Sequence, residues 1–256
     1  LADTSEGFKI KTRMSGHGQV GNGSCCEWVA NDHSIKVDGV TRFEWDNFEE
    51  DDCGNNPLIG QGGTWPYARE GWCPGDKVKE YEFELTQYVT PGDSVALDYV
   101  INDVPIFDPG QGSGNYRAAY DLISYSAPNF VQDAAIVDVL NPSNYEYYSK
   151  YNPTCSNPRV ILRNTGSDSL TSCTIQCWIT YGNYIDYQWT GSLGFMEEEI
   201  VEIPVAEDSW WNDLDQNMTF TAYVRDLNGQ WGNDEYLQNS VKKSKFDAPE
   251  TVEGPF

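Results

Sequence analysis

The residues best suited to chemistry lie between positions 14 and 75. This stretch places Glu27 beside Trp28, and Arg69 three residues before Trp72. Indole faces stack on the apolar faces of sugar rings or on cations. A glutamate flanked by tryptophan can have its pKa raised by desolvation, and it can then serve as a general acid or base. The same residue types also suit a structural role, because a tryptophan near a disulfide usually packs and a single glutamate is usually a solvated surface group.

The elements that must hold these residues are strands. Phe8, Ile10 and Met14 fall on one side of a period-two pattern, and similar alternation occurs at 81–85, 95–101 and 116–122. Such patterns are typical of antiparallel sheets with one buried face. Asp38-Gly39, between two apolar runs, predicts a two-residue hairpin turn. No amphipathic helix exceeds three turns, so we predict an all-β protein whose Gly-rich loop at 53–75 carries the candidate site.

Composition limits the function classes. The 256 residues include 40 acidic and 16 basic side chains, which gives a net charge of −24. Hydrophobic residues make up 39% and aromatic residues 14%, so the chain can bury a core and is not intrinsically disordered. Without clustered Lys and Arg, binding to nucleic acid is excluded. No apolar run is long enough for a transmembrane helix.

A domain boundary is predicted near Ala127-Pro128. Residues 1–127 form a block with long loops, whereas residues 128–256 contain six or seven short strands at the spacing of an immunoglobulin-like β-sandwich. The chain opens Leu-Ala-Asp-Thr, with neither Met nor an apolar signal segment. We therefore expect a processed piece of a longer precursor.

The seven cysteines predict disulfides rather than a metal site. They lack the C-x-x-C spacing of zinc frameworks, and the two histidines are too few for a copper or zinc centre. We predict a Cys53–Cys73 bond and a bond from Cys155 to Cys177 or Cys173, which favours a secreted or cell-surface protein. We expect no cofactor. Calcium is the alternative, at Asp213, Asp215, Asp226 and Asp234, although their spacing is not that of an EF-hand and turn formation explains them equally well.

Several strings in the first half resemble the C-terminal jelly roll of the bacterial peptide:N-glycosidase F family. The resemblance covers residues 8–126 and rests on Met-Ser-Gly-His-Gly (14–18), Cys-Cys-Glu-Trp (25–28), His33, Cys-Gly-Asn-Asn-Pro (53–57) and Arg-Glu-Gly-Trp-Cys-Pro-Gly (69–75). It implies a jelly-roll sandwich for residues 1–127. Enzymes of this family hydrolyse the amide that joins an N-linked glycan to asparagine, at the interface of two jelly rolls.

The resemblance also implies residue roles. Glu27 corresponds to a functionally important glutamate of the family, so it is the candidate catalytic residue. The candidate substrate-binding residues are Trp28, Arg69, Trp72, His17 and Trp65, with His17 at a position where the family has tryptophan. Val29 replaces a cysteine that would close a short loop with the equivalent of Cys25. We therefore expect a vicinal Cys25–Cys26 bond to hold that loop instead.

The family's principal catalytic aspartate lies in an N-terminal jelly roll for which this chain has no room before Phe8. Amide hydrolysis needs groups positioned on both sides of the scissile bond. We therefore expect the isolated chain to be inactive as a peptide-N-glycosidase unless an N-terminal jelly-roll domain or another chain complements it. Its expected partner is a glycoprotein or glycan.

The second half resembles the adhesion-type immunoglobulin-like modules of secreted Bacteroidetes proteins. The resemblance rests on Arg-Val-Ile-Leu-Arg-Asn-Thr-Gly-Ser (159–167), Leu-Thr-Ser (170–172), Trp-Thr-Gly (189–191), Asn-Gly (228–229) and Asn-Asp-Glu (233–235). Proteins of this layout are often type IX secretion cargo. The alternative function is therefore a non-catalytic adhesion or structural module of a large exported or cell-surface protein.

Overall fold

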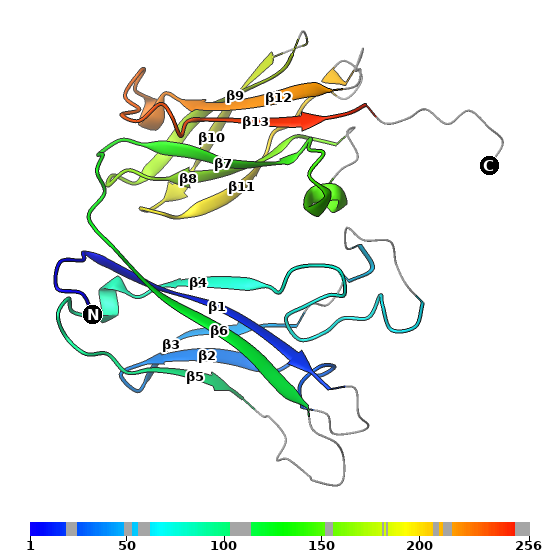
Figure 1. Ribbon diagram of the computed structural model, residues 1–256. Coiled ribbons are helices and arrows are strands. Elements are labelled where there is room, and N and C mark those ends of the chain that lie inside the picture. Colours follow the sequence, from blue (N-terminus) through cyan, green and yellow to red (C-terminus); the bar gives the residue numbers. More distant parts are fainter. Residues whose placement is uncertain are drawn as a thin grey trace. The chain divides into compact units, whose positions relative to one another are not determined.

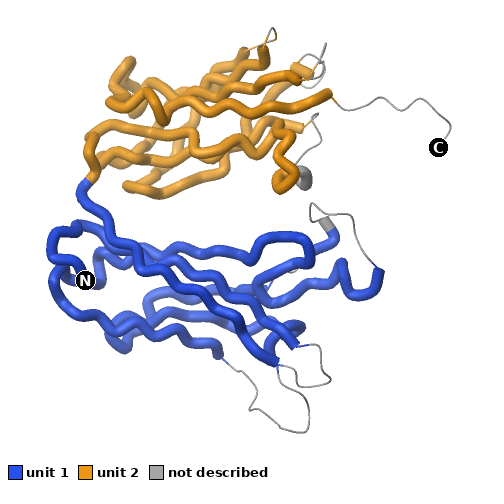
Figure 2. The backbone as a smooth tube through the Cα atoms, in the orientation of Figure 1, with its two compact units in different colours: residues 1–127 blue, residues 128–256 orange. Residues whose placement is uncertain are grey.

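A computed structural model describes residues 1–18, 25–48, 53–55, 62–102, 114–151, 156–180, 182, 184–206, 210–211 and 217–248. The chain divides into two compact units, Leu1–Ala127 and Pro128–Phe256 (Figure 2). Strands and short 3-10 turns make up the regular structure of the described residues, which confirms the all-β fold class. None of the helical segments in these ranges is long and apolar enough to cross a membrane.

Unit 1 consists of two antiparallel three-stranded sheets, in the orders β4-β1-β6 and β3-β2-β5 (Figure 1). Its elements are β1 (Gly7–His17), β2 (Asp32–Val37), β3 (Val40–Asp46), η1 (Cys53–Asn55), β4 (Glu80–Glu84), η2 (Thr86–Tyr88), β5 (Leu97–Ile101) and β6 (Asn115–Tyr125). The apolar positions of β1 and β2 are buried, whereas Tyr120 and Leu122, in the predicted alternating run at 116–122, are 45% and 50% exposed. Phe8 and Ile10 of β1 pack with Ile35 and Val37 of β2 in one buried cluster. The two sheets therefore form a sandwich, as predicted.

The turn between β2 and β3 is the predicted hairpin turn. Asp38 and Gly39 have φ values of 49° and 79°, and Val37 pairs with Val40 across the turn. Positive φ at both central residues is what a two-residue turn between twisted strands requires. This hairpin fixes the register of β2, which carries His33 into the site described below.

Unit 2 is a second sandwich, of a four-stranded sheet (β10-β9-β12-β13) and a three-stranded sheet (β11-β8-β7). Its elements are β7 (Ala134–Asn141), η3 (Glu146–Tyr151), β8 (Arg159–Asn164), β9 (Leu170–Ile179), β10 (Tyr184–Leu193), β11 (Glu198–Glu202), β12 (Met218–Arg225), η4 (Leu227–Gly229) and β13 (Val241–Phe246). Buried side chains from both sheets, among them Leu162, Ile175, Trp189 and Phe220, form its core. Seven described strands in a four-plus-three arrangement agree with the predicted immunoglobulin-like sandwich.

The cysteines match the predictions in part. Cys53–Cys73 and the vicinal Cys25–Cys26 bond are both present. The expected partnership of Cys177 or Cys173 with Cys155 is wrong, because Cys173 and Cys177 are buried free thiols. Both face the core from β9, a strand with a neighbour on each side. Cys155 itself lies outside the described residues.

Asp133 and Asp234 form a buried pair of carboxyl groups that makes the stability of unit 2 depend on pH. Burial, together with the neighbouring Asp133 carboxylate, raises the pKa of Asp234 from 3.8 to about 6. The folded state therefore holds this proton more tightly than the unfolded chain does. The resulting stabilisation is present in full below the unfolded pKa and is lost as the pH rises through the folded pKa.

We expect Asp234→Asn to raise the free energy of unfolding of unit 2 at neutral pH by about 1–2 kcal/mol, after allowance for solvent screening. The new amide can donate to Asp133 Oδ1, a buried oxygen that has no hydrogen-bond partner among the described residues. Urea unfolding of both proteins across the range from about pH 4 to 7 measures the effect. Glu199→Gln, at an exposed position of β11, is the control and should leave the pH dependence unchanged. If the stability of the variant falls with rising pH as steeply as that of the wild type, Asp234 is not the group responsible.

Candidate functional site

Arg69 is the centre of the candidate site in unit 1. Its side chain is 4% exposed and lies between two indole rings, with the guanidinium carbon 4.4 Å from the ring centre of Trp28 and 4.9 Å from that of Trp72. Its Nη1 donates to Tyr67 O (2.8 Å), and its Nη2 donates to Thr64 O (3.0 Å). Burial lowers the pKa of this guanidinium, and the hydrogen bond and charge of Glu27 oppose that shift. The cost of burying this cation is therefore offset by the negative charge of Glu27 and by the faces of two tryptophan rings.

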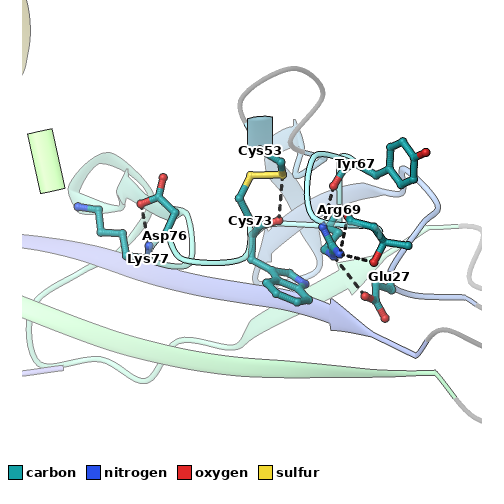
Figure 3. Close-up of a disulfide and its surroundings, with 9 residues drawn as sticks. Glu27, Cys53, Tyr67, Arg69, Cys73, Asp76 and Lys77 are labelled. Atoms are coloured by element: carbon teal, nitrogen blue, oxygen red, sulfur yellow. Dashed lines mark hydrogen bonds and ion pairs between the residues drawn. A yellow bond between two sulfur atoms is a disulfide. The ribbon is translucent and has the colours of Figure 1, made fainter. Parts of the chain in front are cut away.

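Glu27 completes this cluster from the segment that follows the vicinal disulfide. Its Oε1 lies 3.3 Å from Arg69 Nε (Figure 3). Its Oε2 accepts a hydrogen bond from Gly18 N at 2.9 Å. The side chain keeps 11% of its surface exposed. The carboxylate is therefore oriented by two donors and still meets solvent along one edge.

His17 and Trp72 lie together at the end of β1. Their ring centres are 5.0 Å apart, and Trp72 Nε1 donates to Gly16 O at 2.8 Å. Ser15 Oγ and His17 Nε2 are 2.8 Å apart. Burial and the charge of Arg117 lower the pKa of His17, and the charge of Glu27 opposes that shift. The structure thus brings together His17, Glu27, Trp28, Arg69 and Trp72.

Two local features shape the loop that carries Arg69 and Trp72. The Cys53–Cys73 disulfide ties its end to η1, as Figure 3 shows. Gly71 has φ +76°, and a Cβ there would lie 2.1 Å from Met14 O, so only glycine allows the loop to approach β1. The predicted binding residue Trp65 is half-buried in the same loop, and it makes no ring contact with the other candidate residues in the described part of the chain.

A buried polar triad behind this cluster was not predicted. His33 Nε2 lies 2.5 Å from Glu70 Oε1, and His33 Nδ1 lies 2.5 Å from Tyr99 Oη. His33 and Glu70 are both 0% exposed. The Glu70 backbone also joins the site, since its N donates to Glu27 O and its O accepts from Gly16 N, both at 3.0 Å. The sequence could indicate that His33 lies at a buried position of a strand. It could not indicate that Glu70 is its partner, because Glu70 is 37 residues away.

Two of the four residues considered for calcium, Asp226 and Asp234, lie in the described part of the chain, and each has another partner there. Asp226 is paired with Arg225, and Asp234 accepts a hydrogen bond from Ser240. Asp213 and Asp215 lie outside the described residues. Within the ranges that the structure describes, no group of three or more His, Cys, Asp or Glu side chains could hold a metal ion.

The fold and the site together define unit 1 as a β-sandwich with an aromatic and charged cluster at the end of β1. Residues 1–121 match the family model described as "Peptide-N-glycosidase F, C terminal". Unit 1 therefore carries a peptide-N-glycosidase F-like C-terminal domain, as the sequence strings predicted.

The chain is also similar to individual proteins. The peptide-N(4)-(N-acetyl-beta-D-glucosaminyl)asparagine amidase F of Elizabethkingia miricola is 31% identical over 84 residues, which are 30% of this chain and 23% of that protein. The solved structure of the glycosylasparaginase PNGase F from Flavobacterium meningosepticum has 25% identity and a TM-score of 0.45, over 49% of this chain and 42% of that one. A recombinant PNGase F has 24% identity and a TM-score of 0.44, over 49% and 41% of the two chains. This chain thus spans less than a quarter of the length of the curated amidase.

Proposed function

We propose that unit 1 recognises N-linked glycans on glycoproteins through the cluster around Arg69. The observation that supports this proposal is the arrangement of Glu27 and two indoles around one buried guanidinium, in a domain like that of an asparagine-linked glycan amidase. The half-buried faces of Trp28 and Trp72 suit the apolar side of a sugar ring, and the exposed edge of Glu27 suits a sugar hydroxyl or a bridging water.

In this proposal Arg69 is a positioning residue. Its Nε, Nη1 and Nη2 all donate to groups of the protein itself, which are Glu27, Tyr67 and Thr64. A guanidinium so occupied acts on a ligand through the side chains that it holds. The residues that touch the glycan are therefore Glu27, Trp28, Trp72 and His17.

Hydrolysis of the glycan–asparagine amide requires, in this proposal, a second catalytic carboxylate from an N-terminal jelly-roll domain of the same precursor or from another chain. An acid and a base must act on opposite sides of the scissile bond. Glu70 adjoins the site but cannot supply the second group, because its side chain is fully buried and hydrogen-bonded to His33. Glu27 is then half of a catalytic pair.

An extracellular location fits this role. The two disulfides are typical of an oxidising compartment, and the acidic surface is typical of a soluble exported protein. We place the chain among secreted or cell-surface Bacteroidetes proteins exported by type IX secretion. If unit 1 binds no glycan, the alternative is an adhesion or structural module of a large exported protein.

The test is a titration of the 256-residue chain with an N-glycosylated peptide and with the same peptide lacking its glycan. We expect binding of the glycosylated form alone, weakened about tenfold by Glu27→Gln, because a charge-assisted hydrogen bond is lost. Glu44→Gln, at an exposed position of β3, is the matched control. Equal affinity for the two peptides, or no binding, would favour the adhesion alternative.

A second measurement follows N-glycan release from a denatured glycoprotein. We expect no release by the isolated chain. Release that disappears in the Glu27→Gln variant would mean that this chain holds its own second catalytic group, and it would overturn the requirement for a further domain.

A further inference from the structure

The outward face of the four-stranded sheet in unit 2 carries a group of polar residues, with Tyr223 and Trp178 beside them. In the register of β9 and β10, Gln188 lies opposite Thr174 and Asp186 opposite Gln176, while Arg225 of β12 lies opposite Thr174 on the other side. Directly opposed residues share one face of a sheet. The alternate residues of β9, Cys173, Ile175 and Cys177, face the core. These five polar residues therefore lie side by side on the outer face, where Thr174 is covered by its neighbours and only 5% exposed.

Hydrogen bonds hold these polar side chains in place. Gln176 Nε2 donates to Asp186 Oδ1 at 2.8 Å, and Gln188 Nε2 donates to Thr174 Oγ1 at 3.1 Å. Arg225 Nη2 donates to Asp186 Oδ2 at 3.0 Å. Such a network fixes the positions of hydroxyl, amide and carboxylate groups before any ligand arrives, which lowers the entropy cost of binding.

Trp231 stands beside this surface with its indole 88% exposed, the highest value among the exposed large hydrophobic residues of the described chain. It lines a groove of about 320 Å³ together with Ser172, Thr174, Gln188, Asp226 and Gly229. This volume falls within the range of small-molecule sites, roughly 300–1,000 Å³. An indole left in water next to a polar groove gains free energy when a ligand covers its face.

The turn before Trp231 is firmly built. Asn228, at φ 53°, accepts hydrogen bonds at Oδ1 from Thr171 N (2.8 Å) and Thr171 Oγ1 (2.9 Å), and donates from Nδ2 to Ser169 O (3.1 Å). Leu227 is fully buried in the core beneath this turn. These contacts anchor the backbone that carries the indole and fix the side of the groove from which it projects.

We propose that this groove binds a neutral carbohydrate, with one sugar ring stacked on Trp231 and its hydroxyls bonded to Gln188, Ser172 and Asp226. Sugar rings combine an apolar C–H face with hydroxyls that both donate and accept, which matches one indole beside amide, hydroxyl and carboxylate groups. Asp186 and Asp226 and the net charge of −24 disfavour anionic sugars. The site goes beyond the function proposed for unit 1, and no residue of unit 1 contributes to it.

The test is calorimetric titration of the 256-residue chain with mannotriose, cellotriose and triacetylchitotriose, and with trigalacturonate as the anionic comparison. We expect binding of at least one neutral trisaccharide and none of trigalacturonate. Trp231→Ala should weaken that binding tenfold or more and Trp231→Phe about threefold, because a smaller aromatic platform remains. Gln188→Ala should weaken it by a similar few-fold factor.

Two controls separate this site from the proposed function of unit 1. Tyr145→Ala removes an exposed aromatic ring elsewhere in unit 2, and Glu27→Gln alters the unit 1 cluster. Both should leave trisaccharide binding by unit 2 unchanged. Failure to bind any neutral trisaccharide overturns the proposal, and so does binding that Trp231→Ala leaves within twofold. Binding that Glu27→Gln abolishes and Trp231→Ala does not would assign the sugar to unit 1 alone.

Discussion

Replacing Arg69 by methionine is expected to lower the free energy of unfolding of unit 1 by about 3–5 kcal/mol, the cost of removing one partner of a buried ion pair. Methionine fills part of the same volume, so the loss is mainly electrostatic. The Glu27 carboxylate would lose its Nε donor, and the carbonyls of Thr64 and Tyr67 would lose theirs. The two indoles would also lose the cation between them.

Urea unfolding of the full chain, followed by far-UV circular dichroism and by hydrogen exchange of unit 1 amides, measures this loss. Arg42→Met is the matched control, because Arg42 also lies over an aromatic ring, 4.5 Å from the centre of Tyr88, but is exposed. That change should cost less than about 1 kcal/mol. Adding Glu27→Gln to Arg69→Met should restore part of the loss, since no uncompensated charge then remains. If Arg69→Met lowers the free energy of unfolding as little as Arg42→Met does, the Arg69 guanidinium does not hold the cluster together.

The regular parts of the fold could be predicted because they depend on local patterns. The alternation of Phe8, Ile10 and Met14 in β1 fixes which face is buried, and Asp38-Gly39 fixes a turn that few other residue pairs allow. The free thiols could have been predicted by the same rule. Cys173 and Cys177 alternate with outward residues in one apolar strand, a pattern that favours core positions over disulfides with a distant loop.

The site could be predicted only in composition. Its residue types were evident, but the contacts of Arg69 with Glu27 and of Glu70 with His33 join positions 42 and 37 residues apart. No periodicity specifies such pairs, because loop closure and sheet packing bring them together. Arg69 is a predicted substrate-binding residue, and its hydrogen bonds to Glu27, Tyr67 and Thr64 could not be read from the sequence.

Gly16 is the position where a single methyl group should disturb this assembly most. A Cβ at Gly16 would lie 1.4 Å from Cys26 O and 3.0 Å from Glu70 Cβ. The first of these atoms belongs to a backbone held by the vicinal disulfide, so it cannot swing aside as a flexible side chain could. We expect Gly16→Ala to destabilise unit 1 by about 3 kcal/mol, at the upper end of overpacking effects.

The control is Gly62→Ala, where the added methyl group would meet nothing within 4 Å. That change should be neutral or slightly stabilising, because alanine restricts the unfolded chain. Both variants are measured by urea unfolding and by the glycopeptide titration. Gly16 N and O bind Glu70 O and Trp72 Nε1, so moving this strand end to relieve the clash would also shift the indole. We therefore expect the Gly16 variant to lose glycopeptide affinity even where it remains folded. Retained stability and affinity would mean that the approach of β1 to Cys26 is not required for the site.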